Sequence, residues 1–246
     1  MENLQNEIRW LLQEKYGNKP SEKFNKDVDR LKKGEPLDYV IGFTEFLGCK
    51  ILVDKNVLIP RFETEFWVQE AIEEISNSKF QASRILDMFA GSGCIGLAIL
   101  KNIKNAQVVF ADSEKNALHM LQKSCRINKI HKTRYKIMQS DVFSNVKGAF
   151  DYIFANPPYI PLKRKGKIQP SVLKYEPKEA LFGGSDGLFF IRKFLAEAKN
   201  FLNPGGKIYM EFDPPQKKQI TALLKKYKSW QFHKDQYGKW RWVQIG

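Results

Sequence analysis

The chain has 246 residues, of which 43% are hydrophobic and 28% are charged, and its formal net charge at pH 7 is +14. This balance excludes an intrinsically disordered chain, because enough apolar surface is available to offset the conformational entropy lost on folding. The longest uncharged stretch, residues 88–100, contains three glycines and is shorter than the ~20 apolar residues of a membrane-spanning helix, so we expect no membrane association.

Two short amphipathic helices are predicted at the N-terminus. Apolar residues recur at helical spacing over residues 4–12 and again over residues 24–31. Glycine and proline end the first pattern at residues 17–20 and the second at residues 34–36. Two helices of this size cannot form an independent core, so they must pack on the rest of the chain or on a partner. We therefore treat residues 1–35 as a short N-terminal helical segment.

Residues 36–64 are predicted to form a linker that contains a β-hairpin. Residues 46–53 have the pattern of two strands around Gly48, and a turn separates them from a further extended apolar run at residues 57–60. Thr64 is a residue type that commonly caps helix N-termini, so we expect it to cap a helix that continues to Ile75.

From residue 65 to residue 246, short apolar runs alternate with helical patterns. Continuous apolar strands that alternate with helices predict a mostly parallel sheet covered by helices on both faces. The last two strands have only a turn at Gly238 between them, so they should pair antiparallel. The predicted strands are residues 85–89, 108–111, 135–138, 150–154, 207–212, 230–233 and 240–245, and the predicted helices are residues 94–100, 117–127, 188–201 and 216–227.

A glycine-rich loop follows the first of these strands and opens the next helix. Glycines at 91, 93 and 96 let the backbone turn tightly and approach a ligand closely. Asp112 ends the next strand about twenty residues further on, where a carboxylate can accept both ribose hydroxyls of a nucleoside. Asp141 follows the third strand, again at the edge where such sheets bind ligands. A structural turn or helix capping explains each residue alone, but their periodic placement favours a nucleoside ligand, either a dinucleotide or S-adenosylmethionine.

The segment Asn156-Pro157-Pro158-Tyr159 directly follows the fourth strand. Two prolines remove two amide donors and hold the loop rigid. The Asn156 side-chain oxygen and a proline carbonyl can then accept hydrogen bonds from one planar NH2 group, beside the flat apolar wall of Tyr159. Such a site orients an amide or an exocyclic amine, which a dehydrogenase does not need. The segment therefore favours S-adenosylmethionine, although a rigid turn alone would also explain it.

Cysteines and histidines are few and scattered. Cys49, Cys94 and Cys125 lack metal-ligand spacing, so we expect reduced thiols in a cytoplasmic protein and no metal site. The N-terminus has no signal-peptide pattern. The net positive charge indicates an anionic partner such as nucleic acid or a ribosomal surface, although charge alone does not distinguish binding from solubility.

The loop Asp87–Gly96 together with Asn156–Tyr159 resembles class I S-adenosylmethionine-dependent methyltransferases that act on planar nitrogen. Residues 36–65, with further matches from residue 175 onward, make the chain similar to the HemK/PrmC family over about residues 36–246. That family methylates the side-chain amide nitrogen (N5) of the glutamine in the Gly-Gly-Gln motif of peptide chain release factors. The resemblance implies a Rossmann-like α/β methyltransferase domain over residues 65–246, with a seven-stranded, mostly parallel sheet and an antiparallel last strand.

The resemblance also implies the cofactor, the partner and the site. The cofactor is S-adenosylmethionine, and its product is S-adenosylhomocysteine. The partner is a class I release factor. We expect the enzyme to be a monomer that contacts the ribosome transiently. In-line methyl transfer to an amide nitrogen needs little acid–base help, and positioning supplies much of the catalysis. The residues implied for cofactor binding are Asp87, Phe89, Ala90, Gly91, Ser92, Gly93, Asp112, Asp141, Val142 and Asn156. Those implied for catalysis are Asn156, Pro157, Pro158 and Tyr159, and the same four with Arg61 and Glu63 are implied to bind the substrate.

Two other functions remain open at this point. Methylation of an exocyclic amine of DNA or RNA, of the adenine N6 type, would use the same Asn-Pro-Pro-Tyr geometry, and the net charge favours it. Against it, the sequence has no separate nucleic-acid recognition module, and residues 60–65 favour a protein substrate. A non-catalytic basic RNA-binding module is the other alternative. The basic run Lys163–Lys167 fits either a solvated loop or a contact surface for an acidic partner or ribosomal RNA.

Overall fold

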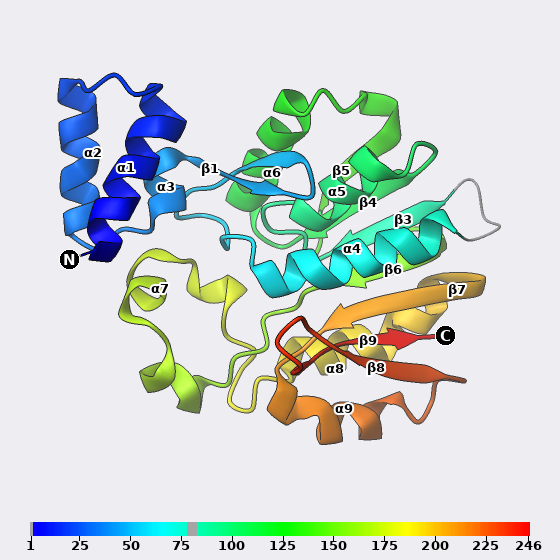
Figure 1. The fold of residues 1–246 in the computed structure, drawn as a ribbon. Coiled ribbons are helices and arrows are strands. Elements are labelled where there is room, and N and C mark those ends of the chain that lie inside the picture. The colour runs from blue at the N-terminus through cyan, green and yellow to red at the C-terminus, as the bar shows by residue number, and fades with distance from the viewer. Residues whose placement is uncertain (1, 78–82) are drawn as a thin grey trace.

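The structure is a computed structural model that describes residues 2–77 and 83–246. Its centre is a seven-stranded sheet of order β5-β4-β3-β6-β7-β9-β8 (Figure 1). Neighbouring strands from β5 to β7 are parallel, whereas β9 is antiparallel to both β7 and β8. This arrangement confirms the predicted mostly parallel sheet with an antiparallel last strand. The strands are β3 (Arg84–Met88), β4 (Gln107–Asp112), β5 (Tyr135–Gln139), β6 (Phe150–Ala155), β7 (Leu202–Glu211), β8 (Trp230–Lys234) and β9 (Trp240–Ile245).

Helices bury an apolar core on each face of this sheet. Successive strand residues point to opposite faces, so Ile85 joins one buried cluster and Leu86 the other. The first cluster lies under α4 (Phe62–Ser76), α5 (Cys94–Asn102) and α6 (Lys115–Ile127), and the second under α8 (Phe189–Glu197) and α9 (Lys217–Leu224). The short 3-10 helices are η1 (Lys132–Arg134), η2 (Leu162–Lys167), η3 (Lys178–Ala180), η4 (Ala198–Phe201) and η5 (Pro214–Gln216).

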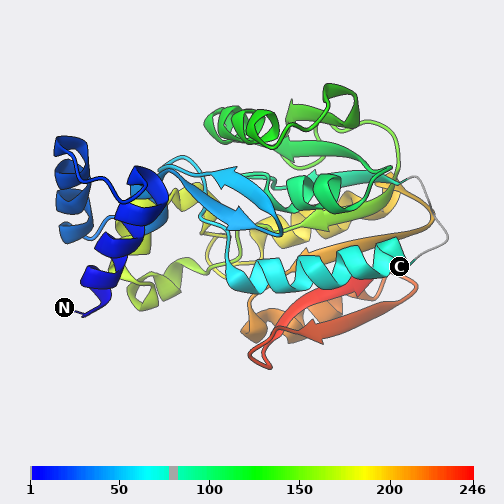
Figure 2. The ribbon, with the colours of Figure 1, turned by 45° about the horizontal axis from the view of Figure 1, so that its top comes forward.

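The N-terminal helices form a small cluster of their own. Helices α1 (Glu2–Tyr16), α2 (Glu22–Lys32) and α3 (Leu37–Ile41) bury Leu11, Phe24, Leu31 and Val40 together. The hairpin of β1 (Phe43–Phe46) and β2 (Cys49–Leu52) lies between these helices and the main sheet (Figure 2). It is tied to the end of α6, because the Leu52 amide donates to Ser124 Oγ at 3.0 Å. The division into residues 1–35, 36–64 and 65–246 stays a prediction.

Several predicted boundaries are wrong, each for a local reason. Helix α4 begins at Phe62 with Arg61 in the capping position, so Thr64 lies inside the first turn and does not cap the helix. Its hydroxyl is used elsewhere, as described below. Strand β7 begins at Leu202 rather than Lys207, because the chain stays beside β6 through an irregularity in register. Residues 57–60 form a loop, and α3 and α7 (Pro170–Tyr175) are too short to show a periodic pattern.

Gly96 is where α5 packs closest to the sheet, and it allows a direct prediction. A Cβ atom there would lie 2.2 Å from the Phe110 ring and 2.9 Å from Asp87 Oδ2. We expect Gly96→Ala to lower the free energy of unfolding by about 1–3 kcal/mol, because overpacking a filled core outweighs the gain in helix propensity. Urea denaturation measures this change. Gly166→Ala is the matched control, since nothing lies within 4 Å of its Cβ position, and an equal effect of both variants would contradict the packing argument.

Candidate active site

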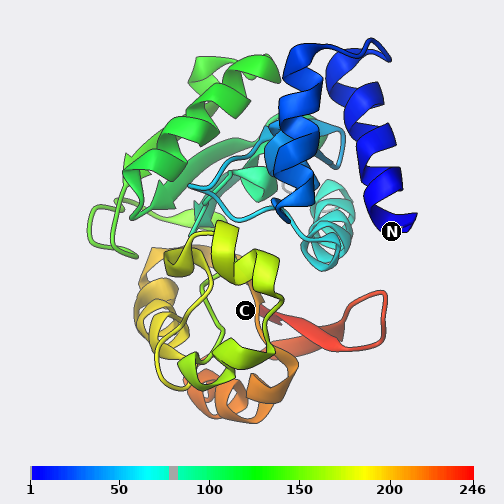
Figure 3. The same ribbon diagram turned by 90° about the vertical axis from the view of Figure 1, so that its left-hand side faces the viewer.

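The loops at the carboxyl ends of β3, β4, β5 and β6 line one pocket, below referred to as the first pocket. Figure 3 views the molecule from the side on which α1–α3 and α7 lie, toward which these strand ends point. Residues of the loop 56–61 and Thr64 on α4 close the pocket from the linker side. Its lining residues include Asn56, Val57, Leu58, Pro60, Arg61, Thr64, Phe89, Ala90, Gly91, Ser92, Cys94, Asp112, Ser113, Glu114, Ser140, Asp141, Val142, Asn156, Pro158, Pro177, Glu179, Ala180 and Phe190.

The glycine-rich loop presents its backbone to this pocket. Phe89, Gly91 and Gly93 all have positive φ, at 60°, 51° and 79°, so the chain reverses direction within five residues. The Ala90 amide donates to the Ala111 carbonyl at 3.1 Å, which fixes the loop against β4. Gly93 does not line the pocket; a Cβ there would collide with Leu121 at 2.5 Å. Of the predicted loop residues, 89–92 therefore face the pocket and Gly93 provides close packing behind it.

Asp112 is the carboxylate that the pocket holds at the end of β4. Its two oxygens accept hydrogen bonds from the amides of Gly91 at 2.7 Å and Glu114 at 2.8 Å, and burial raises its pKa. Each oxygen keeps a further lone pair, so the carboxylate can still accept hydroxyl groups from a ligand. A carboxylate beside a loop whose residues line the pocket fits a nucleoside with a free ribose, and thus fits S-adenosylmethionine.

Asp87 plays a different part from the one predicted. It is fully buried and lines neither pocket. Its Oδ2 accepts from the Gly96 amide at 2.9 Å, whereas Oδ1 has no hydrogen-bond partner within the described part of the chain. Asp87 therefore supports the glycine-rich loop and the start of α5 from behind.

Asp141 and Val142 form the rim of the pocket after β5. Asp141 is exposed, and its carboxylate forms an ion pair with Lys193 at 2.6 Å. Val142 is buried with φ of 50°, and the Ser140 hydroxyl donates to its carbonyl at 2.6 Å. Both residues line the first pocket, where they present one charged and one apolar group.

A second pocket lies against the first. It shares Leu58, Arg61, Asn156 and Ala180 with it, so the two pockets adjoin at these four residues. Most of the lining residues are apolar, and the polar side chains include those of Arg61, Asn156, Gln169 and Glu211. The complete lining is Leu58, Arg61, Asn156, Pro157, Tyr159, Ile160, Ile168, Gln169, Val172, Ala180, Leu181 and Glu211. This pocket suits a short, planar side chain whose polar end reaches Asn156.

Glu211, Thr64 and Trp67 are buried, were not predicted as site residues, and are joined by hydrogen bonds in this region. Glu211, at the end of β7, accepts hydrogen bonds from Thr64 Oγ1 and Trp67 Nε1, both at 2.7 Å, and from the Tyr159 hydroxyl at 2.9 Å. Thr64 Oγ1 in turn accepts from Asn156 Nδ2 at 3.3 Å. The available signal was a glutamate that directly follows the apolar residues 208–210 of β7, because a buried carboxylate needs partners.

Glu63 and Arg61, the two residues near the linker that were predicted to bind the substrate, differ in whether they line the pockets. Glu63 lines neither pocket; it lies in the first turn of α4 with its side chain half-exposed. Arg61 lines both, but its Nη2 lies 2.7 Å from each oxygen of Glu176, whose side chain is 1% exposed. Arg61 therefore holds residues after α7 against the linker and neutralises a buried charge.

We expect Arg61→Ala to destabilise the fold by about 3–5 kcal/mol, because it leaves the Glu176 carboxylate buried and unpaired. A drop in melting temperature measures the loss. Arg9→Ala, at an exposed position on α1, is the matched control and should leave the melting temperature unchanged. A thermally intact Arg61→Ala protein would show that Glu176 finds another partner.

A doubly covered parallel sheet, a glycine-rich loop after its first strand and Asn-Pro-Pro-Tyr after its fourth define a class I methyltransferase. Residues 69–174 match the family model for the methyltransferase small domain. A solved methyltransferase from Pyrococcus furiosus has the same fold, with a TM-score of 0.57, 21% identity, and coverage of 80% of this chain and 88% of that one.

Curated relatives identify the particular family. A release factor glutamine methyltransferase from Lactococcus lactis is 34% identical over 98% of this chain and 88% of its own length. Another from Geobacter sulfurreducens is 37% identical over 80% of this chain and 67% of its own length. The chain belongs to the release factor glutamine methyltransferase family, which confirms the resemblance to HemK/PrmC.

Residues 2–77 and 83–246 contain neither a metal-binding cluster nor a membrane-spanning helix. No group of three or more His, Cys, Asp or Glu side chains there is placed to hold a metal ion. No helix in those ranges is long and apolar enough to cross a membrane.

Proposed function

We propose that this chain transfers a methyl group from S-adenosylmethionine to the side-chain amide nitrogen of the glutamine in the Gly-Gly-Gln motif of a class I release factor. One observation supports this most strongly: the pocket that fits a nucleoside and the pocket that fits a planar side chain meet at Asn156. We also propose that the enzyme acts as a cytoplasmic monomer and contacts the ribosome only transiently.

In the first pocket, the chain's own residues bind and orient the cofactor. S-adenosylmethionine supplies an electrophilic methyl group when it is bound. Asp112 accepts the ribose hydroxyls, and Asp141 and Val142 border the adenine. The backbone of the loop 89–92 leaves room for the methionine end.

In the second pocket, two acceptors hold the substrate amide. The lone pair of an amide nitrogen is delocalised, so this nitrogen is a weak nucleophile. Asn156 Oδ1 and the Pro157 carbonyl accept its two N–H bonds and stabilise positive charge that develops on nitrogen in the transition state. The ring of Tyr159 and the apolar wall exclude water and keep the NH2 group in line with the methyl group.

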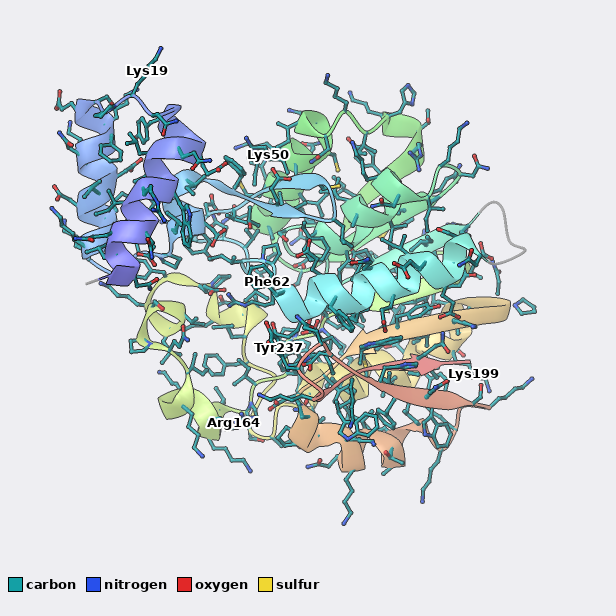
Figure 4. All side chains as sticks on the ribbon, viewed as in Figure 1. Lys19, Lys50, Phe62, Arg164, Lys199 and Tyr237 are labelled. Atoms are coloured by element: carbon teal, nitrogen blue, oxygen red, sulfur yellow. The ribbon has the colours of Figure 1, made fainter. Side chains whose placement is uncertain are left out.

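The net positive charge does not by itself favour a nucleic-acid substrate. Lys19, Lys50, Arg164 and Lys199 lie on four separate segments around the molecule (Figure 4): the loop between α1 and α2, β2, η2 and η4. Arg164, in the basic run after the Asn-Pro-Pro-Tyr segment, is paired with Asp213. Charge spread in this way serves solubility as readily as binding.

A labelling experiment tests the function. The protein and S-adenosylmethionine with a labelled methyl group are incubated with a release factor, with its Gly-Gly-Gln→Gly-Gly-Ala variant, and with total nucleic acid. Label on the unaltered factor alone is the expected result. Label on nucleic acid alone would overturn the proposal in favour of exocyclic amine methylation.

A further inference from the structure

Glu211 lines the second pocket together with Asn156 and is 1% exposed. It ends β7, next to β6, whose end leads into Asn156. Three donors converge on its two oxygens: the Thr64 hydroxyl, the Trp67 indole N–H and the Tyr159 hydroxyl. An ionised carboxylate can only accept hydrogen bonds, so all three partners must direct their hydrogens toward Glu211.

This requirement fixes the direction of the next hydrogen bond. A threonine hydroxyl has one hydrogen, and Thr64 gives it to Glu211. Toward Asn156 the same oxygen can therefore only accept, and the group it contacts is Nδ2, at 3.3 Å. With Nδ2 turned toward Thr64, the Asn156 Oδ1 is left for the junction of the two pockets. Rotation of the Asn156 amide by 180° would set Oδ1 against the lone pairs of Thr64.

We propose that Glu211 is a positioning residue which, through Thr64, determines that the oxygen of Asn156 and not its NH2 group faces the acceptor amide. This inference rests on the proposed function. This orientation would explain how the site selects an amide over a carboxylate. Asn156 then offers a hydrogen-bond acceptor to an NH2 group, whereas the reversed orientation would offer a donor and suit a carboxylate. Burial raises the pKa of Glu211, while its three donors and the nearby Arg241 favour the ionised form. Tyr159, held by the same carboxylate, keeps its ring in the pocket wall.

The first test removes the acceptor between Glu211 and Asn156. Thr64→Val keeps the shape of the side chain but lets the Asn156 amide turn freely, so kcat should fall about 10- to 100-fold, the cost of leaving a buried polar group without its partner. The dissociation constant of S-adenosylhomocysteine should change less than threefold. Thr64→Ser restores the hydroxyl and should recover most of the lost turnover. Thr221→Val, on α9 and outside both pockets, is the matched control.

The second test asks whether Thr64 and Glu211 act through Asn156. In an Asn156→Ala background, Thr64→Val should have no further effect on turnover, because coupled residues are non-additive. Glu211→Gln keeps one oxygen for Thr64 and Trp67 and should lose less turnover than Glu211→Met. If Glu211→Met does not fold, the Thr64 series alone decides.

These experiments distinguish failure of the positioning role from failure of the proposed function. A wild-type protein that does not label the release factor would overturn the proposed function. With an active wild type, full activity of Thr64→Val would overturn the positioning role. An additive loss in the double variant Thr64→Val, Asn156→Ala would also overturn it, because Thr64 would then act independently of Asn156.

Discussion

Asn156→Ala is expected to reduce kcat for methyl transfer by about 10²–10³-fold, the loss seen when one preorganised polar group at the reacting centre is removed. In the proposed mechanism Asn156 Oδ1 is the side-chain acceptor for the substrate amide, and the Pro157 carbonyl alone cannot fix the plane of that amide. Asn156 lines both pockets. The affinity for S-adenosylhomocysteine should fall much less, by under about tenfold, because most of the first pocket is unchanged. Single-turnover methylation and calorimetric titration measure the two quantities.

Asn102→Ala provides the matched control for this variant. Asn102 lies at the end of α5, lines neither pocket, and donates to the carbonyls of Ala98 and Leu47. It should keep normal turnover. Near-normal turnover in Asn156→Ala, with the control also active, would remove Asn156 from the catalytic site.

Asp112→Ala is expected to weaken binding of S-adenosylhomocysteine by about 100-fold or more, because a hydrogen bond to a charged group contributes about 1.5–3 kcal/mol and the carboxylate can accept two ribose hydroxyls. The variant also frees the Gly91 amide, to which Asp112 Oδ2 is bound at 2.7 Å, and so loosens the loop. Turnover at saturating cofactor should fall less than affinity. Isothermal titration and a cofactor-dependent rate curve test this.

Variants of two other aspartates serve as comparisons for the effect of Asp112→Ala on cofactor affinity. Asp141→Asn should weaken cofactor binding by less than about tenfold, since its side chain is 62% exposed and water competes for it. Asp29→Ala, on the exposed face of α2, should have no effect on the affinity. Equal affinities of the Asp112 and Asp29 variants would show that Asp112 does not contact the ribose.

The centre of the sheet could be predicted from the sequence because strands such as β3 and β6 are buried on both faces. A run such as Ile85–Met88 is apolar at nearly every position, and residues between such runs have helical spacing. The same reasoning does not find α3 or α7, since helices of five or six residues show at most two turns of periodicity. It also misplaced the start of α4, because a threonine near a helix start was assumed to cap it.

The site could be predicted in part. Residues 89–92, Asp112, Asp141, Val142 and Asn156 all line the first pocket, as expected of groups at the carboxyl ends of parallel strands. Asp87, Gly93 and Glu63 line neither pocket, because lining depends on side-chain direction and on the packing of Leu121 and Phe110, which spacing does not encode.

The alternation of strands and longer helices in the main sheet, the glycine-rich loop and the Asn-Pro-Pro-Tyr segment follow from the sequence, because these depend on local periodicity and on backbone properties of glycine and proline. That Thr64 and Glu211, which are 147 residues apart, meet beside Asn156 is visible only in the folded chain. Contacts between residues so far apart in the sequence follow from how α4 packs across β6 and β7, and no local pattern predicts them. The direction in which the Asn156 amide points is set by these contacts.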